Sequence, residues 1–495
     1  MRRKRIVVTM RVVWQILIHA VRGNEADIHK AIFDGFIELG GVYIKFLQVL
    51  SLNSRFMASW NSADKFKVFD SVRADELDIH ETLERELGDR KQRIVAVDSI
   101  PFAAGSFAQV YGARLDDGTS VVLKVQRPSL RELLSFDLKL LQIFVWIVNF
   151  IGSDLLEGMS NVFKDFKQAT LDETNYVHER EFGNEMHEHY RNHPKIVIPY
   201  TYAELSTDRM ITQQRIDGLP VTKLIEMHNT GYDPQAHVMK TMGSNMTWQM
   251  ELVGTELLYG IFVLPRVQGD PHPGNILLLP DNKVGVIDFG VSAPPPDDKL
   301  AFLGVMRGYV DMYSGGRDMG DFLMKILRFF ARDLYRAMMT IAKHNQRYDQ
   351  DAPDMIEIFK GTVERSFEAN AGNVDVNQLI RQGNLYRLLQ ETVNENNRYS
   401  IKMSVDGALM LRAANIYMSM LASLGIKKDV LTQTFNNVIY AVETNHSALV
   451  DKAAKGTDIG EAIEIVSEWL ESIAEKDPAL SRKLAESVRN RTKER

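Results

Sequence analysis

The sequence predicts an α+β fold of two lobes, a small β-rich N-lobe and a large helical C-lobe, preceded by a helical extension. Apolar residues alternate between positions 94 and 125, as is typical of antiparallel strands, and Lys124 lies in the last of them. Further along, Asp270 and Asn275 precede a predicted β-hairpin and an Asp-Phe-Gly triplet that begins at Asp288. This order is typical of protein-kinase-type phosphotransferases.

Composition narrows the class of protein. With 495 residues and ordinary apolar content, the chain can bury a large core and form two or three structural units. A net charge of −6 gives no indication of a nucleic-acid partner. The chain has no cysteine, which excludes disulfides, a thiolate zinc site and a cysteine nucleophile. No apolar run reaches the ~18–20 residues that span a bilayer, so we expect a cytoplasmic protein without a transmembrane helix.

Residues 1–92 are predicted to form the helical extension. Its first residues are basic, and they precede an apolar run that ends near Val21 and is too interrupted for a signal peptide. Two interpretations stay open. A basic amphipathic helix could lie on the inner face of an anionic membrane, with Trp14 dipping in, as a peripheral contact through residues 1–21. Alternatively, the helix packs on the body of the protein and its charged end is simply solvated.

The N-lobe is predicted over residues 93–217, with a helical insert. Two of its strands flank a loop of small residues, which would let backbone N–H groups approach phosphate oxygens. Lys124 would add a positive charge there, although a solvated lysine at a sheet edge is the plainer alternative. The candidate nucleotide-binding residues of the loop are Ala103, Ala104, Gly105 and Ser106.

The helical insert should supply a glutamate that pairs with Lys124 and orients it toward the phosphates. Glu179, Glu181 and Glu185 compete for this role. Two more strands follow, and the linker between the lobes is expected near Gln214 and Ile216, which we include among the nucleotide-binding candidates.

The C-lobe is predicted over residues 218–442, and a helical tail over 443–495. Two apolar runs separated by Pro280-Asp-Asn predict the hairpin that joins the catalytic and metal loops. Three prolines from Pro294 onward follow the Asp-Phe-Gly triplet at once. They leave no room for the long activation segment of a regulated protein kinase.

With these motifs established, the chain resembles the UbiB family of atypical protein-kinase-like proteins, which are associated with coenzyme Q biosynthesis. The segment PFAAGSFAQVYGARLDDGTSVVLKVQRP resembles the family's alanine-rich loop and nucleotide lysine, and GDPHPGNILL with VIDFG resembles its catalytic and metal motifs. IKFLQ lies where the family has K-x-G-Q, and ITQQRIDGLPV resembles the strand and linker between the lobes.

The resemblance implies roles for individual residues. Lys124 would contact the ATP phosphates, Asp270 would be the catalytic-loop aspartate, and Asn275 and Asp288 would hold Mg²⁺. Glu181 takes the lysine-pairing role in the alignment we favour, and a shifted alignment nominates Glu179. Lys45 and Gln48 would line a site that the extension covers, where a protein kinase docks its peptide.

The chain departs from the family pattern in three places. Leu47 replaces the glycine of K-x-G-Q and adds bulk, while Gly105 replaces an alanine of the phosphate loop. The family's E-x-D carboxylates are missing, because Asn175 and Val177 occupy those positions.

We therefore expect an Mg-ATP-dependent atypical kinase or ATPase that supports quinone or isoprenoid-lipid metabolism at or near a membrane. Its ligands would be ATP, Mg²⁺ and a lipid or quinone precursor. The alternatives are a nucleotide-binding pseudokinase scaffold and a true protein kinase. The covering helix at Lys45 argues against the protein kinase.

Overall fold

The computed structural model describes fifteen segments of the chain. They are residues 2–21, 25–51, 77–105, 107–150, 163–164, 166–168, 170–171, 174–269, 271–314, 319–348, 356–357, 359–361, 405–426, 429–445 and 465–466. The chain divides into two compact units. Unit 1 comprises Met1–Asp217 and Gly285–Val291, and unit 2 comprises Gly218–Val284 and Ser292–Arg495. The main boundary lies after Asp217, where the sequence analysis ends the N-lobe. The predicted tail, 443–495, begins inside a helix that ends at Asn445, and from 446 onward it lies outside the described residues apart from 465–466.

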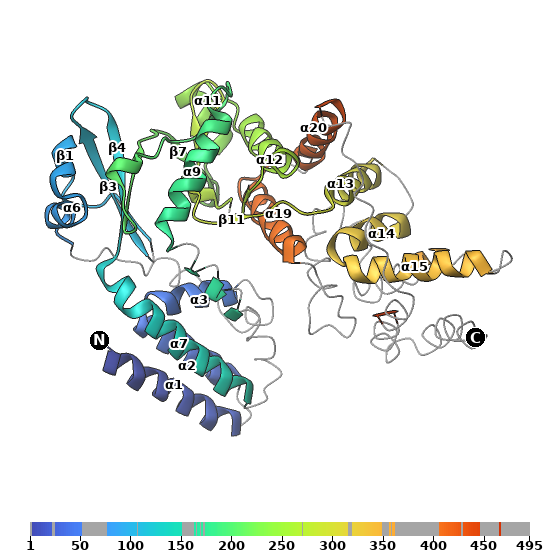
Figure 1. Cartoon of the computed structure of the whole chain (residues 1–495), viewed down its shortest axis with the longest axis horizontal. Helices are drawn as coiled ribbons and strands as arrows, with labels where there is room; N and C mark the ends of the chain where they lie inside the picture. Colours follow the sequence, from blue (N-terminus) through green and yellow to red (C-terminus); the bar gives the residue numbers. More distant parts are fainter. Residues whose placement is uncertain are drawn as a thin grey trace. The chain divides into compact units, whose positions relative to one another are not determined.

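Unit 1 begins with packed helices (Figure 1). These are α1 (Arg2–Val21), α2 (Glu25–Leu39), α3 (Val42–Ser51) and α7 (Pro128–Phe150). Gly40 and Gly41 separate α2 from α3 with φ values of 67° and 56°, a left-handed conformation that glycine adopts without strain. The four helices share one apolar core centred on Phe36, Phe46 and Phe144. Helix α1 therefore buries one of its sides against the other helices of this group.

The N-lobe sheet has five strands in the order β1-β3-β4-β6, with β2 paired to β3. The strands are β1 (Ile94–Val97), β2 (Ala103–Ala104), β3 (Ala108–Leu115), β4 (Ser120–Gln126) and β6 (Met210–Gln214). Helix α6 (Ile79–Leu87) begins at Asp78, whose carboxylate accepts from two backbone amides, and it packs its apolar face on the sheet. Strand β4 is central, which places Lys124 between Val110 and Ile211 of the neighbouring strands.

Helix α9 (Tyr176–Tyr190) begins at Asn175, whose side chain accepts from the His178 amide. The Asn184 side chain donates to the Thr201 carbonyl and accepts from the Thr201 amide, at 3.1 and 3.0 Å. Thr201 forms an isolated β-bridge to Gln213 of β6, so the two hydrogen bonds of Asn184 tie α9 to the sheet.

Unit 2 is mostly helical. Its helices are α10 (Val221–Asn229), α11 (Pro234–Met242), α12 (Met246–Val263), α13 (Lys299–Tyr313), α14 (Met319–Phe330), α15 (Arg332–Tyr348), α19 (Val405–Ser423) and α20 (Asp429–Asn445). Its short strands are β7 (Leu219–Pro220), β8 (Val267–Gln268) and β11 (Ser292–Ala293), and β8 pairs with β11.

The predicted hairpin comprises β9 (Ile276–Leu279) and β10 (Lys283–Val286). Asp281 and Asn282 adopt φ values of 60° and 55° at its tip, as a type I′ turn requires. The Gln249 amide on α12 donates to the Leu279 and Lys283 carbonyls, which fixes the hairpin on that helix. None of the helices in the described segments is both long and apolar enough to cross a membrane.

Candidate functional site

Lys124 owes its position to the alternation of β4. Leu123 and Val125 point into the core and are at most 2% exposed, so Lys124 projects from the opposite face of the sheet. Its side chain retains 17% of its accessible surface. The lysine is therefore partly buried on a central strand, which excludes the solvated sheet-edge alternative.

The partner of Lys124 is Glu179 on α9. The two carboxylate oxygens accept from the lysine Nζ at 2.6 and 2.9 Å, and the carboxylate is 1% exposed. Our preference for Glu181 as this partner was wrong, because Glu181 lies two residues further along α9 and is exposed. The buried face of α9 contains Tyr176, Phe182 and Met186, and at 100° per residue Glu179 belongs to that face.

Asp288 completes the cluster within unit 1. Its Oδ2 lies 3.3 Å from the Lys124 Nζ, and its Oδ1 accepts from the Gly290 amide at 2.9 Å. The adjacent Phe289 is buried and meets Phe182 of α9 edge to face, with ring centroids 5.7 Å apart. The aromatic contact fixes the Asp-Phe-Gly triplet against the same helix that carries Glu179.

Burial and neighbouring charges shift the pKa values of this cluster in opposite directions. Burial raises the pKa of Glu179 to about 7. Burial alone would lower the pKa of Lys124, but the carboxylates of Asp288 and Glu179 outweigh it and raise that pKa. For Asp288, burial is outweighed by the Lys124 ammonium and the Gly290 N–H, so the pKa of this carboxyl is lowered. Asp288 is consequently a carboxylate at neutral pH.

A residue that the sequence analysis missed lies beside the lysine. The ring of Tyr176 is buried, and its centroid is 5.5 Å from the Lys124 Nζ, a cation–π distance. Tyr176 precedes Glu179 by three residues on α9 and shares its face. This spacing was the available signal, since an aromatic residue three positions before the pairing glutamate should reach the same cation.

Lys45 of α3 also reaches this part of unit 1. Its Nζ lies 4.7 Å above the centroid of the Phe107 ring, and its charge contributes to the lowered pKa of Asp288. Leu47, the residue that replaces the family's glycine, is fully buried in the extension core. The extra bulk is thus accommodated among the helices. The side chain of Gln48 lies outside the described residues.

The small-residue loop is organised as a hairpin between β2 and β3. Ala103 and Ala104 pair with Val110 and Gln109 as strand residues, while the Gly105 amide donates to the Ala108 carbonyl at 2.8 Å. The Gly105 carbonyl accepts from Arg127 at 2.9 Å. The Gly105 N–H is therefore engaged within the loop in this structure, and Ser106 lies outside the described residues.

The remaining candidates are distributed over both units. Gln214 ends β6 and is exposed, and Ile216 is half-buried in the segment that follows. In unit 2, Asn275 ends a 3₁₀ turn, η3 (Pro273–Asn275), and its amide donates to the His272 carbonyl. Asp270 lies outside the described residues. Lys124 and Asp288 are thus brought together in one unit, and Asn275 belongs to the other.

Comparison with known proteins agrees with this arrangement. Residues 67–306 match the family model of the ABC1 atypical kinase-like domain. This part of the chain belongs to the UbiB/ABC1 family. The ABC1 domain thus includes the lysine strand, α9, the hairpin and the Asp-Phe-Gly triplet.

Three curated relatives illustrate the spread of the family. An uncharacterized protein of Mycobacterium tuberculosis, Rv0647c, is 26% identical over 292 residues, which cover 56% of this chain and 57% of the relative. The probable protein kinase UbiB of Cronobacter sakazakii is 27% identical over 255 residues, covering 50% and 44%. The chloroplastic protein ACTIVITY OF BC1 COMPLEX KINASE 3 of Arabidopsis thaliana is 27% identical over 229 residues, covering 45% and 30%.

The matched regions therefore cover between 30% and 57% of the length of these relatives. Among solved structures, the complex of Rv3197 with erythromycin from Mycobacterium tuberculosis aligns with a TM-score of 0.43 and 22% sequence identity, covering 79% of this chain and 90% of that one.

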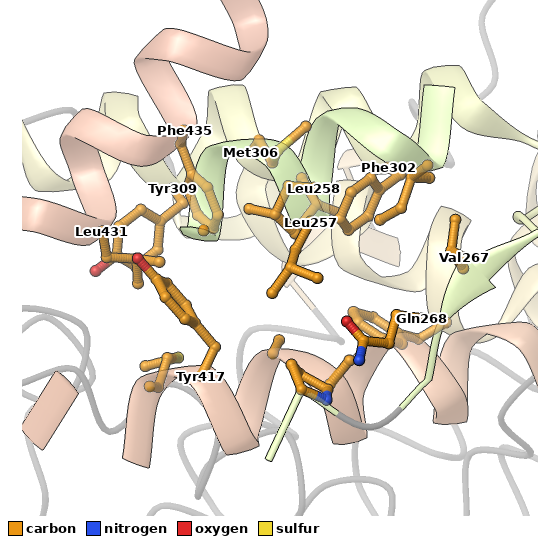
Figure 2. Close-up of a pocket in the computed structure, with 18 residues that line it drawn as sticks. Leu257, Leu258, Val267, Gln268, Phe302, Met306, Tyr309, Tyr417, Leu431 and Phe435 are labelled. Atoms are coloured by element: carbon orange, nitrogen blue, oxygen red, sulfur yellow. The ribbon is translucent and has the colours of Figure 1, made fainter. Parts of the chain in front are cut away.

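An apolar cavity of about 100 Å³ lies in unit 2 (Figure 2). Side chains from α12, α13, α19 and α20 surround it, among them Met306, Tyr309 and Phe435. Gln268 and Pro271, which flank Asp270 in the sequence, also line it. The hydroxyl of Tyr417, a further lining residue, donates to the Met250 carbonyl at 2.8 Å, so its polar end is satisfied.

Proposed function

We propose that the chain is an Mg-ATP-dependent atypical kinase or ATPase. One observation carries the proposal: the Lys124 ammonium contacts Glu179 and Asp288 together, at 2.6 and 3.3 Å. Kinase-type phosphotransferases need a lysine held by a helix carboxylate beside the metal-binding aspartate, because this geometry directs the lysine to the phosphates. Two of the relatives have names that include the word kinase, which supports phosphotransfer for this chain as well.

The donor set fits the expected cofactor. Asp288 is a carboxylate with a lowered pKa, and Asn275 offers a carboxamide oxygen, which are ligand types that Mg²⁺ prefers. These two residues would hold the ion, which neutralises phosphate charge when bound. Lys124 would bind the α- and β-phosphates, and Asp270 would orient the attacking hydroxyl or water.

The test is steady-state phosphate release from Mg-ATP by the purified chain, with nucleotide binding measured in parallel. Asp288→Asn removes a charge with little change in volume, so release should fall to background while the fold is retained. Asp270→Asn should lower turnover and leave ATP binding nearly intact. Release at the wild-type rate from Asp288→Asn contradicts the metal assignment. Mg-dependent ATP binding without release under any condition favours a pseudokinase scaffold.

For the acceptor or effector, we propose a molecule with an apolar part, such as a quinone precursor or an isoprenoid lipid. The apolar lining of the cavity supports this class; its volume of about 100 Å³ is below the roughly 150 Å³ of a cavity that binds benzene, so only part of such a molecule would enter it. The cavity lies against residues adjacent to Asp270 in the sequence, so an occupant could affect the catalytic loop. A phenol-type quinone-precursor mimic is a suitable probe.

Two substitutions on α19 test the cavity. Ala414 lines it, so Ala414→Leu should fill part of the space and weaken binding of the phenol mimic about tenfold, with ATP binding unchanged. Ala422 lies on the same helix, is exposed and is not among the lining residues, so Ala422→Leu is the matched control. Equal affinities of both variants and the wild type for the mimic would exclude this cavity as its site.

A further inference from the structure

Helix α1 is apolar on two sides, and only one of them is covered within the described part of the chain. Val8, Val12, Val13 and Ile16 are buried in the extension core. The opposite side exposes five large apolar residues: Ile6, Val7, Met10, Trp14 and Leu17. A helix that only packed on its neighbours would carry polar residues on that side.

The exposed residues form a continuous stripe along the helix. Their spacing of three or four positions places them above one another on successive turns. Val7, Met10 and Trp14 are 60%, 62% and 64% exposed, so most of each side chain faces solvent. At 1.5 Å per residue, the stripe from Ile6 to Leu17 is about 16 Å long. We call these five residues the outer face of α1.

Helix α7, which packs beside α1, adds apolar surface of its own. Ile143 and Trp146 of α7 are 53% and 68% exposed. Arg5 of α1 binds Asp137 of α7 at 2.7 Å, and the Arg2 guanidinium lies over the Phe136 ring. These contacts hold α1 beside α7, so that two neighbouring helices each present a tryptophan to solvent.

The charged residues of α1 itself have one sign. Helix α1 contains no acidic residue, and Arg3 and Lys4, at the end where the outer face begins, are exposed. Arg11 is also exposed and binds Glu38 of α2, with Nη2 and Oε2 2.5 Å apart. An apolar stripe with exposed tryptophan and flanking cations matches an anionic lipid surface, in which indole rings lie at the headgroup level and cations meet phosphates.

We propose that the outer face of α1 docks the chain on the surface of an anionic bilayer, with α1 lying in the plane of the interface. Vesicle binding through this face does not require the phosphoryl chemistry proposed for the Lys124 site. Asp288→Asn should accordingly bind vesicles as the wild type does, which makes a failure of either proposal distinguishable from a failure of the other.

The test is co-sedimentation of the full chain with vesicles of phosphatidylcholine alone or with 30% phosphatidylglycerol, a composition chosen as roughly physiological. The wild type should bind the anionic vesicles at least about tenfold more tightly than the neutral ones. Trp14→Glu places a charge in the outer face and should weaken that binding about tenfold or more. Because Trp14 is exposed, the substitution removes little core packing, and an unchanged melting temperature verifies the fold.

Ile100→Glu is the matched control, since Ile100 is 79% exposed on the N-lobe and away from α1 in the sequence. It should leave vesicle binding unchanged. Arg3→Glu should reduce binding to anionic vesicles and leave binding to neutral ones unchanged. The proposal is overturned if the wild type does not bind anionic vesicles or if Trp14→Glu binds as tightly as Ile100→Glu. A dimer that Trp14→Glu converts to monomers, without vesicle binding by either protein, would assign the face to a second copy and also overturn it.

Discussion

Replacing Glu179 by glutamine tests the central contact of the site. The substitution keeps the volume of the side chain and removes the charge that Lys124 meets at 2.6 Å. The Lys124 ammonium would keep Asp288 at 3.3 Å as its remaining carboxylate, and we expect it to shift toward that residue. The lysine would then be poorly placed for the phosphates and would compete with the metal for Asp288.

The energetic cost of Glu179→Gln depends on how deeply the Lys124–Glu179 ion pair is buried. Breaking a buried ion pair typically costs about 3–5 kcal/mol, because one charge is left uncompensated. Here Asp288 still compensates the lysine, whose side chain retains 17% exposure, and burial raises the pKa of Glu179 to about 7, so the loss of unfolding free energy should lie well below this range. Separately, because the lysine is no longer held toward the phosphates, kcat/KM for ATP hydrolysis should fall by at least about tenfold.

Glu181→Gln is the control, because it makes the same chemical change two residues away on an exposed position of the same helix. Its kcat/KM should stay within about twofold of the wild type, since exposed positions contribute little. The assay is phosphate release over a range of ATP concentrations, with the fold of each variant checked by melting temperature. Equal losses in the two variants, or a larger loss in Glu181→Gln, would refute the assignment of Glu179 as the lysine's partner.

Three further predictions follow from the same contacts. Burial raises the pKa of Glu179 from 4.5 to about 7, so the ion pair gains its full charge as pH rises through 7. We expect kcat/KM to rise between pH 6 and 8 in the wild type and to lack this step in Glu179→Gln. The free energy of unfolding should instead fall as pH rises over this range, because native Glu179 keeps its proton between pH 4.5 and 7 while the unfolded chain has lost it. This stabilising contribution is present below pH 4.5 and is lost as pH rises through 7, and denaturant unfolding at several pH values measures it. Gly218→Ala should destabilise the chain by about 1–3 kcal/mol, since its Cβ would lie 2.6 Å from Leu279 Cδ2 and 2.9 Å from Leu277 Cβ; an unchanged melting temperature would contradict this packing. Gly105→Ala should fold normally, because its Cβ would meet only the Ala108 carbonyl at 3.9 Å, so any change in measured ATP affinity reports on the loop itself.

Much of the N-lobe could be predicted from local patterns. Strand alternation placed Lys124 on a strand, and the structure has it on β4. The Asp281-Asn282 turn was readable because few residues tolerate the positive φ values of a two-residue hairpin. These features depend on sterics within a few residues of the chain, so the sequence was sufficient to predict them.

The partner of Lys124 could not be chosen in the same way. Motif spacing favoured Glu181 and nominated Glu179 only under a shifted alignment, and the phase of α9 distinguishes them. That phase is set where Asn175 caps the helix and where Phe182 meets Phe289, a contact between residues more than one hundred positions apart. The two interpretations of α1 were not exclusive either, since the structure buries one side of the helix and exposes the other.

The sequence by itself determined the chemical groups of this protein: a lysine strand, an Asp–Asn loop and an Asp-Phe-Gly triplet, in the order of a kinase-like fold. Their types and order are covalent properties of the chain. Tertiary structure decided which carboxylate meets Lys124, that Lys45 acts on Asp288, and which side of α1 stays exposed. These outcomes depend on burial and on contacts distant in sequence, because electrostatic and packing energies are set by distance in space.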